Sequence, residues 1–219
     1  MKKAIFFGVA IICTMSLSAC IVPNEMRYVH ETEEGVPEDW QQDDYFFPKG
    51  TTSQVYKATF ADFGPQQEEE VTLYITEIQA FEEGTLYELK IDSDVEAPDT
   101  HAGYRGDWRN FGLFYVQGDE IYFIRAEEAK GKYETAEEIL NAGALVCSEV
   151  GEEDALGEDE RGWHEFILVD GDRREYHGYS TLVETGYYEH FFWEEGKGLV
   201  KYESGYGALA DGIEMYLMD

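Results

Sequence analysis

Near its C-terminus the chain contains Tyr187-Tyr188-Glu189-His190-Phe191-Phe192-Trp193-Glu194-Glu195-Gly196-Lys197-Gly198-Leu199-Val200-Lys201. Aromatic and β-branched side chains, which pack well on a pleated surface, flank a short segment that holds two glycines. Glycine readily adopts the positive φ that a tight reversal of the chain requires. The sequence therefore predicts an antiparallel hairpin, with strands at 187–193 and 199–202 joined by residues 194–198.

The same pattern continues along most of the chain. Alternating or apolar runs bounded by turn residues predict the other strands at 54–60, 71–81, 85–91, 111–116, 120–125, 163–169 and 213–218. One short helix is predicted near 135–142, because a Thr135 to Glu138 capping box starts it and Gly143 can end it. The class is therefore mainly β, an antiparallel meander of hairpins that forms a sandwich or a partly open barrel.

The first residues predict export. Lys2 and Lys3 precede an apolar run from 4 to 15, which small residues follow. This run is shorter than the roughly 20 apolar residues that a membrane-spanning helix needs. Charge, length and small residues together are typical of a secretory signal peptide, so residues 1–19 are expected to be cleaved.

The end of this segment, Leu17-Ser18-Ala19-Cys20, resembles the lipobox of bacterial lipoproteins. The resemblance implies that Leu17, Ser18 and Ala19 are recognised for cleavage and that Cys20 becomes the lipidated first residue. An ordinary signal peptide with a coincidental cysteine is the alternative. Two or more acyl chains anchor a protein firmly, since each buried methylene contributes about 0.8 kcal/mol. The expected location is the extracytoplasmic face of a bacterial membrane.

Charge limits the partners. The chain holds 16 Lys and Arg against 47 Asp and Glu, a net charge of −31. Cleavage after residue 19 removes Lys2 and Lys3 and no acidic residue, which takes the net charge to −33. Nucleic acid is excluded as a partner, because its affinity depends on basic residues that neutralise phosphates. We therefore predict that the lipid on Cys20, and not basic side chains, anchors the protein to the membrane.

The mature chain divides into two parts. Residues 20–44 are polar and acidic beyond Cys20, and we predict a flexible tether that would span roughly 27 Å on average. Residues 45–219 have a suitable length for a single antiparallel β domain.

Two segments resemble a loosely defined group of bacterial lipoproteins and secreted proteins. They are Phe46-Phe47-Pro48-Lys49-Gly50, followed by Tyr56, and the Phe191 to Lys201 segment with its Gly-x-Gly-Leu-Val-Lys ending. The resemblance implies an antiparallel β domain from Tyr45 to the C-terminus. It implies no chemistry.

Acidic and histidine residues suggest two metal hypotheses. Asp92, Asp94 and Glu96 offer oxygen ligands at alternate positions, so residues 92–99 form either a weak calcium site or a solvated acidic turn. No EF-hand is present, since its sixth and twelfth positions would hold Ala97 and Gly103. No other cofactor is predicted.

The second metal hypothesis depends on a turn. If Asp170 and Gly171 form a two-residue turn, His164 lies opposite His177 on one face of a hairpin. A three-residue turn would set Glu165 against His177 instead. The pair is therefore either part of a zinc-type site or an ordinary cross-strand contact.

Aromatic residues are the remaining candidates for ligand binding. The 187–193 strand places rings on both of its faces, with Tyr188, Phe192 and Trp193 as candidate ligand contacts. Both faces are buried in a sandwich, or one face exposes an aromatic platform for an envelope protein, a glycan or a small apolar ligand.

Catalytic motifs are absent from the sequence. It holds no nucleophile elbow, metalloprotease helix or phosphate-binding loop, and Cys147 lies in an apolar run where a buried thiol is expected. We therefore predict no enzyme but a membrane-anchored protein with a noncatalytic binding or structural role in the cell envelope. The alternatives are a carrier of a lipid or other apolar ligand in a half-barrel cavity, and an envelope hydrolase with an unidentified site.

Overall fold

The computed structural model describes residues 26–28, 44–61, 66–94, 109–151, 162–180, 186–206 and 211–219. The elements in these ranges are β1 (Met26–Tyr28), β2 (Ser53–Ala61), β3 (Gln67–Ala80), β4 (Thr85–Asp92), β5 (Asn110–Gln117), β6 (Glu120–Ile124), α1 (Ala136–Ala142), β7 (Ala144–Cys147), β8 (Trp163–Asp170), β9 (Arg173–Ser180), β10 (Tyr187–Glu194), β11 (Gly198–Tyr206) and β12 (Asp211–Leu217). The predicted hairpins and the predicted helix are all present.

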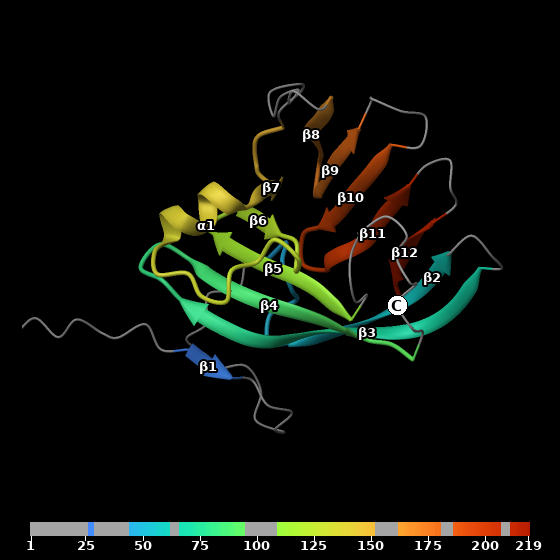
Figure 1. The fold of residues 1–219 in the computed structure, drawn as a ribbon, viewed down its shortest axis with the longest axis horizontal. Helices are drawn as coiled ribbons and strands as arrows, with labels where there is room; N and C mark the ends of the chain where they lie inside the picture. The colour runs from blue at the N-terminus through green and yellow to red at the C-terminus, as the bar shows by residue number, and fades with distance from the viewer. Residues whose placement is uncertain are drawn as a thin grey trace, which may run out of the picture.

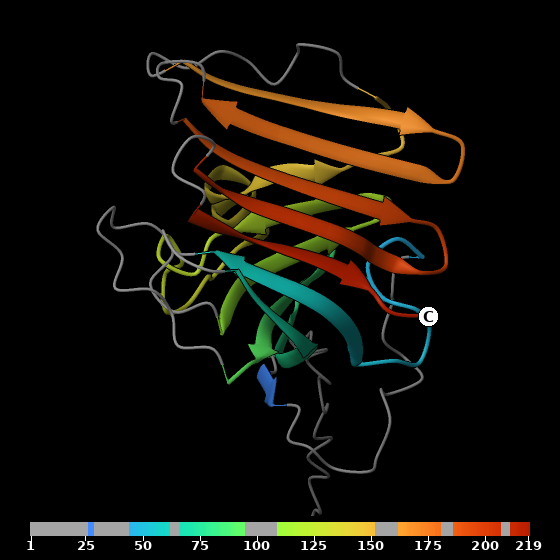
Figure 2. The same cartoon turned by 90° about the vertical axis from the view of Figure 1, so that its right-hand side faces the viewer.

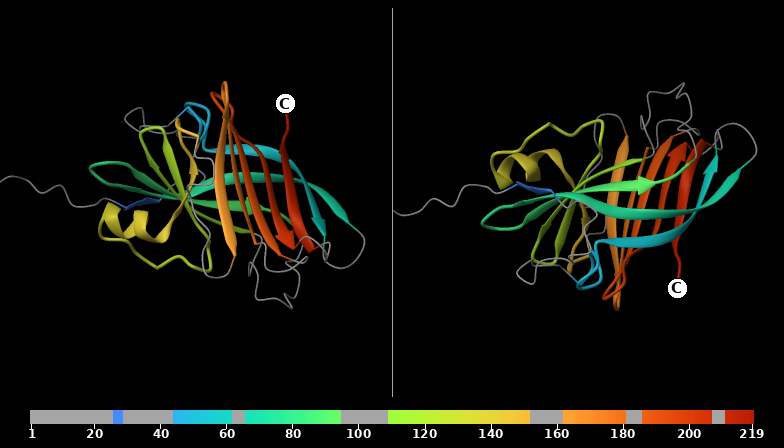
Figure 3. Two further views of the ribbon diagram at one scale, coloured as in Figure 1. Left: turned by 90° about the horizontal axis from the view of Figure 1, so that it is seen from above. Right: turned by 90° about the horizontal axis from the view of Figure 1, so that it is seen from below.

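The strands form one antiparallel sheet in the order β7-β6-β5-β4-β3-β2-β12-β11-β10-β9-β8, and β1 pairs with β3 beside this path. The sheet bends so strongly that β8–β12 lie across β2–β5 (Figure 1). Figure 2 shows β8–β12 side by side along one half, and Figure 3 shows both halves from above and below. The predicted mainly β class is confirmed, and the sheet forms a nearly closed barrel.

Alternating burial explains why these segments form strands. Along β10 every second residue is buried, and the residues between them are partly exposed. The buried positions are Tyr187, Glu189, Phe191 and Trp193. β2 alternates in the same way. One face of each strand therefore turns to the interior of the barrel and the other turns outward.

Aromatic rings fill the interior. The ring centroid of Phe114 lies 4.9 Å from that of Phe123, 5.6 Å from that of Phe111 and 6.0 Å from that of Phe191. Phe46, from the segment before β2, is also fully buried and lies 5.7 Å from Phe114. Rings at these spacings pack as in any protein core.

The two segments that carry the sequence resemblance meet in space. The Gly196 N–H donates to the Asp44 carbonyl at 2.7 Å, and the Gln54 side chain donates to the Lys197 carbonyl at 2.7 Å. Gly198 adopts φ +82°, and a Cβ there would lie 2.7 Å from the Phe46 carbonyl oxygen. The glycines thus permit both the reversal and the close approach of the first segment to the second.

The helix starts as predicted. The Thr135 hydroxyl accepts a hydrogen bond from the Glu138 N–H at 3.2 Å, and the Gly143 N–H donates to the Ile139 carbonyl at 2.8 Å. The Glu138 carboxylate bonds to the Glu134 N–H rather than to the N–H of the cap residue. Ile139 is fully buried, so α1 packs on the outer side of the sheet through this residue.

One strand lies inside the predicted tether. Met26 pairs with Gln79 and Tyr28 pairs with Glu77, so the backbone of β1 extends the sheet beside β3. The remaining residues of the predicted tether up to residue 43 lie outside the described ranges.

Candidate functional site

The outer face of β8–β12 is rich in rings, and we call it the aromatic face. Each of its rings is partly or largely exposed, because its neighbours along the strand take the buried positions. The rings belong to His164, Phe166, His177, Tyr179, Tyr188, His190, Phe192 and Tyr216.

The rings of the aromatic face contact one another. His164 stacks on Tyr179 at 5.5 Å, with 14° between the ring planes, and Phe166 stacks on His177 at 4.9 Å and 19°. The His177 and His190 centroids are 4.7 Å apart. Stacked rings cover each other's faces, so this surface presents largely ring edges.

The register of β8 and β9 differs from both predicted alternatives. The turn consists of Gly171 and Asp172, so Asp170 stays in the strand and pairs with Arg173. Gly171 adopts φ +58°, a conformation that two-residue hairpin turns favour in glycine.

This register separates the predicted histidine pair. His164 lies opposite Tyr179, and His177 lies opposite Phe166, so the prediction that His164 faces His177 is wrong. His177 instead pairs across the other edge of β9 with His190.

The described residues contain no group of three or more His, Cys, Asp or Glu side chains that could hold a metal ion. In the predicted calcium segment, Glu96 lies outside the described residues. Before it, the Glu69 carboxylate accepts hydrogen bonds from the Ser93 hydroxyl at 2.9 Å and from the Asp94 N–H at 2.8 Å. Hydrogen bonds to Glu69 therefore order the end of β4, which includes Asp92.

The candidate ligand residues of β10 lie on opposite faces. Tyr188 and Phe192 belong to the aromatic face, as the hypothesis of an exposed platform requires. Trp193 points inward, is 1% exposed, and donates from Nε1 to the Val146 carbonyl at 3.0 Å. The prediction that Trp193 contacts a ligand is therefore wrong. Successive side chains of a strand point to opposite faces, so Trp193 lies on the buried face of β10, opposite to Phe192.

Charges on the aromatic face are paired. The Lys201 ammonium lies 5.0 Å from the Phe192 ring centre and 4.9 Å from that of Tyr216, and it forms an ion pair with Glu203. A hydrogen bond with His190 is the main reason that the pKa of Glu203 falls to about 2. Burial lowers the pKa of His177.

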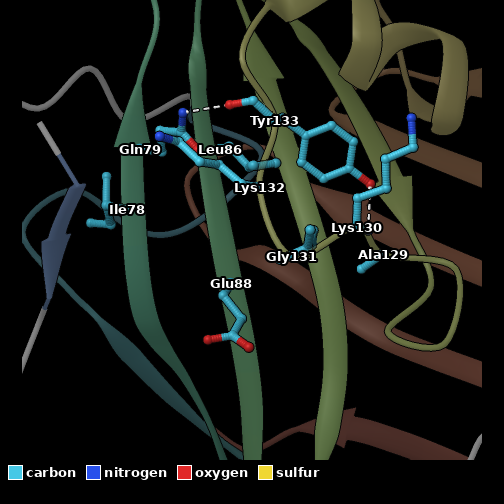
Figure 4. A pocket seen from close by; sticks show the side chains of 10 residues that line it. Ile78, Gln79, Leu86, Glu88, Ala129, Lys130, Gly131, Lys132 and Tyr133 are labelled. Carbon is cyan, nitrogen blue, oxygen red and sulfur yellow. Dashed lines mark hydrogen bonds between the residues drawn. The ribbon is translucent and has the colours of Figure 1, made fainter. Parts of the chain in front are cut away.

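A second candidate is a groove on the outer side of β3–β5, beneath residues 129–133 (Figure 4). Its cavity volume is about 350 Å³, and a further pocket of about 210 Å³ adjoins it at Glu88, Leu113 and Ala129. Leu86 and Leu113 supply apolar lining, and the polar side chains of the lining include Gln79, Glu88, Lys130 and Lys132. This volume and mixture suit a small, mainly apolar ligand.

Two hydrogen bonds hold the segment over the groove. The Gln79 side chain donates to the Tyr133 carbonyl at 2.9 Å, and the Tyr133 hydroxyl accepts from the Lys130 N–H at 3.2 Å. Figure 4 shows both bonds. The Tyr133 ring is buried in a small cluster with Leu86 and Ile139. The groove is therefore built by residues that also anchor α1.

A buried ion pair is the strongest candidate for chemistry. Glu189 is 1% exposed, and its carboxylate accepts from Arg125 Nη2 at 2.7 Å, from Arg125 Nε at 2.9 Å and from the Tyr202 hydroxyl at 2.7 Å. The Arg125 guanidinium also lies over the rings of Trp163 and Tyr187, at 5.7 and 5.2 Å. The pair joins the end of β6 to β10.

A second carboxylate lies two strands from Glu189. Glu165 and Glu189 both pair with Gly178 of β9, one from each side. Burial raises the pKa of Glu165, whose carboxylate accepts hydrogen bonds from Trp163 and Tyr176.

The space between the two carboxylates is filled. A Cβ at Gly178 would lie 2.6 Å from both a Trp163 ring atom and the Tyr176 hydroxyl oxygen. Side chains therefore occupy the position that a substrate would need between an acid and a base, and both carboxylates already hold hydrogen-bond donors.

Glu189 could have been identified from the sequence, and its partner could not. Glu189, Phe191 and Trp193 occupy alternate positions of one strand and therefore share a face. This predicts that the Glu189 carboxylate faces the core and needs a partner there. Arg125 lies 64 residues away, so the pairing depends on the curvature of the whole sheet. The groove has no local signal, because residues 129–133 approach β3–β5 only in the folded chain.

The predicted lipidation site, with Leu17, Ser18, Ala19 and Cys20, lies outside the described residues. No helix among the described residues is both long and apolar enough to cross a membrane. Cys147 is buried, as predicted.

A scan against models of protein families gives no match, and a search of curated proteins gives none. Among solved structures, the chain is similar to a candidate lipoprotein from Parabacteroides distasonis, with 12% identity and a TM-score of 0.38 over 81% of this chain and 98% of the other. It is also similar to a candidate exported protein with a YmcC-like fold from Bacteroides fragilis, with 10% identity and a TM-score of 0.34 over 79% of this chain and 97% of the other. Likeness at this level transfers no function to the chain.

Proposed function

We propose that the chain is a noncatalytic extracytoplasmic lipoprotein, anchored by lipid on Cys20, whose β domain binds a partner protein through the aromatic face. The observation that carries the binding proposal is the layer of partly exposed rings on four of the five neighbouring strands β8–β12. Soluble proteins rarely leave so many neighbouring large rings in contact with water, and such surfaces mark interaction sites.

The orientation of the rings favours a protein over a glycan. A sugar stacks on the free face of a ring, but His164, Tyr179, Phe166 and His177 turn their faces to one another. A surface of aromatic side chains, with charges at Lys201 and Glu203, is typical of protein interfaces.

The size of the face also fits a protein partner. Four strand spacings of about 4.8 Å and eight residues of about 3.3 Å give an area on the order of 500 Å². Two such faces would bury on the order of 1,000 Å² in total, which is the range of small, transient interfaces. A second copy of the chain is a poor partner, because two processed chains with a net charge of −33 each repel each other.

The packed carboxylates support a noncatalytic role. Glu189 holds three donated hydrogen bonds, and ring atoms fill the space between it and Glu165. This arrangement joins β6 to β10 and serves the stability of the barrel.

Site-specific photocrosslinking in the native bacterium tests the binding proposal. A photoreactive benzoyl-phenylalanine replaces Phe166 or Phe192, and in a control chain it replaces Val55, an exposed residue of β2. We expect one discrete protein adduct from positions 166 and 192 and none from position 55.

Three outcomes would overturn this proposal. They are the absence of adducts at all positions, equal adducts at all three positions, and an adduct of twice the mass of the chain, which would identify a second copy as the partner.

Cell fractionation tests the anchor. Replacement of Cys20 with Ala removes the thiol that would carry the lipid. The wild-type chain should sediment with membranes, and the Cys20→Ala chain should not enter that fraction as a processed protein. A mature Cys20→Ala chain that still partitions with membranes contradicts lipid anchoring.

A second function is favoured by the groove. The carrier hypothesis placed an apolar ligand inside the barrel, but rings fill the described interior. The groove beneath residues 129–133 offers an apolar site of suitable volume on the outer side of the sheet instead. Binding of a fluorescent fatty acid that Leu113→Trp abolishes, and Val55→Trp leaves unchanged, would support this second function.

A further inference from the structure

A polar pocket of about 430 Å³ lies at one end of the barrel, where four hairpin turns meet. Figure 2 shows two of these turns, β8–β9 and β10–β11, on the same side of the molecule. We call it the turn pocket. Its ionisable lining residues other than Tyr45 are Asp44, Glu83, Asp119, Glu149, Arg174 and Glu195.

Arg174 is an unusual residue for a barrel interior. It alternates with the buried Tyr176 and pairs with Trp193, so it points inward, and it is only 8% exposed. Nη1 donates to the carbonyls of Gly171 and Arg173, at 2.6 and 2.8 Å.

The rest of the Arg174 guanidinium lacks a polar partner among the described residues. The central carbon of the guanidinium, Cζ, lies 4.8 Å from the ring centre of Tyr45. Arg174 Nε is buried and has no hydrogen-bond partner, and the guanidinium forms no ion pair with the described residues. A buried donor without an acceptor destabilises the folded chain. The chain therefore maintains a positive group beside the turn pocket whose hydrogen-bonding capacity the fold leaves incomplete.

The carboxylates at the turn pocket are unpaired as well. Asp44, Glu83, Asp119, Glu149 and Glu195 form no ion pair with the described residues, although Arg174 lines the same pocket. The turn pocket thus combines one buried positive group with five negative groups that it does not neutralise by contact.

The charges restrict the class of ligand. A simple anion would be repelled by the five carboxylates. A simple cation would be attracted by them, but it would give the Arg174 guanidinium no acceptor. A metal ion fits poorly, since no three acidic or histidine side chains of the described residues could hold one. A molecule that carries both a carboxylate and ammonium groups satisfies both halves of the lining.

We propose that the turn pocket binds a small zwitterion with an excess of positive charge, a diamino acid or a short peptide that ends in one. The ligand carboxylate would bind the guanidinium of Arg174, and its ammonium groups would lie among the five carboxylates. The site is separate from the aromatic face, which occupies the outer surface of β8–β12.

Calorimetric titration of the chain from residue 20, with Cys20→Ala to keep it free of lipid, tests this proposal. The probes are L-lysine, cadaverine, which lacks the carboxylate, and L-norleucine, which lacks the side-chain amine. We expect L-lysine to bind at least tenfold more tightly than either of the others, because each lacks one of the two recognised groups.

Variants locate the site. Arg174→Lys keeps the charge but loses the planar guanidinium, and Glu149→Gln removes one exposed carboxylate from the pocket. Each should weaken L-lysine binding severalfold. Glu127→Gln, an exposed carboxylate outside the pocket lining, should leave it unchanged. The Glu149→Gln chain keeps the test valid if the buried Arg174 variant fails to fold.

Three results would overturn the proposal: equal affinity for L-lysine and cadaverine, which would indicate general attraction of cations; no binding of L-lysine at millimolar concentration by the folded chain; and an unchanged affinity in Glu149→Gln. None of these results bears on the crosslinking test of the aromatic face, so the two proposals fail separately.

Discussion

Strand β10 has two faces of similar composition and very different surroundings. The inner face places Phe191 and Trp193 in the core at no more than 1% exposure, and their rings stack at 5.8 Å with 5° between the planes. The outer face places Tyr188 and Phe192 in a single layer of rings that is open to water. Aromatic content alone therefore does not distinguish a core from a binding surface.

The carboxylates of the two faces repeat this contrast. Inward-facing Glu189 is 1% exposed and satisfied by Arg125 and Tyr202. Outward-facing Glu203 is 23% exposed and is shared by Lys201 and His190. If the contrast is correct, inner substitutions should change stability strongly and outer substitutions should change it little.

The largest difference is expected between two adjacent phenylalanines. Phe191→Ala should lower the free energy of unfolding by about 3–5 kcal/mol, because it opens a cavity among packed rings. Phe192→Ala should cost about 1 kcal/mol, since water can fill the space. Urea unfolding followed by circular dichroism measures both. Equal losses would mean that the outer layer is packed as tightly as the core.

Substitution of the two carboxylates should give the next largest difference. Glu189→Gln should cost about 3 kcal/mol, because it breaks the close buried ion pair with Arg125, whereas the Arg125–Glu128 pair is longer, at 3.4 Å, and more exposed. Glu203→Gln should cost less than about 1 kcal/mol at neutral pH. Urea unfolding at pH 7 compares them, and a double variant, Arg125→Met with Glu189→Leu, should recover most of the loss. If the double variant stays as unstable as Glu189→Gln, the ion pair contributes stability that apolar side chains of similar size cannot replace.

Acid should reveal the outer carboxylate. The pKa of Glu203 is lowered from 4.5 to about 2, so the folded chain binds fewer protons than the unfolded chain between these values. The stabilisation is present above pH 4.5 and is lost as the pH falls toward 2. Glu203→Gln should reduce this loss by roughly 1 kcal/mol, after allowance for screening by water. Unfolding curves from pH 6 to pH 2.5 measure it, and parallel curves for both chains would contradict the assignment.

The smallest effect is expected from His177. Burial lowers its pKa from 6.5, so the unfolded chain takes up the proton first and the folded chain loses stability as the pH falls below 6.5. His177→Gln should remove a few tenths of a kcal/mol of this dependence between pH 7 and 5. Thermal unfolding across this range provides the measurement. His164→Gln is the matched control, because His164 belongs to the same layer but pairs with Tyr179.

Local patterns were sufficient to predict most strands. Alternation identified β2, β10 and the hairpin of β5 and β6, and the capping residue Thr135 identified α1. The nearly closed barrel could not be chosen over the sandwich, because it depends on the pairing of β12 with β2. That pairing joins residues more than 150 positions apart, such as Ile213 and Phe60.

The candidate site was predictable only in part. Tyr188 and Phe192 were found by their place on an aromatic strand, while Trp193 was included although strand alternation places it on the inner face. The predicted contact between His164 and His177 is wrong because the turn lies one residue later than predicted, at Gly171 and Asp172. Asp170, Gly171 and Asp172 are all residue types that turns favour, so the sequence does not fix the position of the turn. The register that exists also depends on the pairing of β9 with β10, which brings His177 to His190.

The short strand β1 has a mechanical consequence for a chain lipidated on Cys20. Five residues lie between Cys20 and Met26, whose backbone pairs with β3, so Cys20 can lie no more than about 20 Å from Met26. A free leash of 24 residues could extend to about 80 Å. The domain would therefore lie close to the bilayer, with β1 nearest to the lipid because the linker from Cys20 is short. The length of the 29–43 segment would not change its height above the lipid.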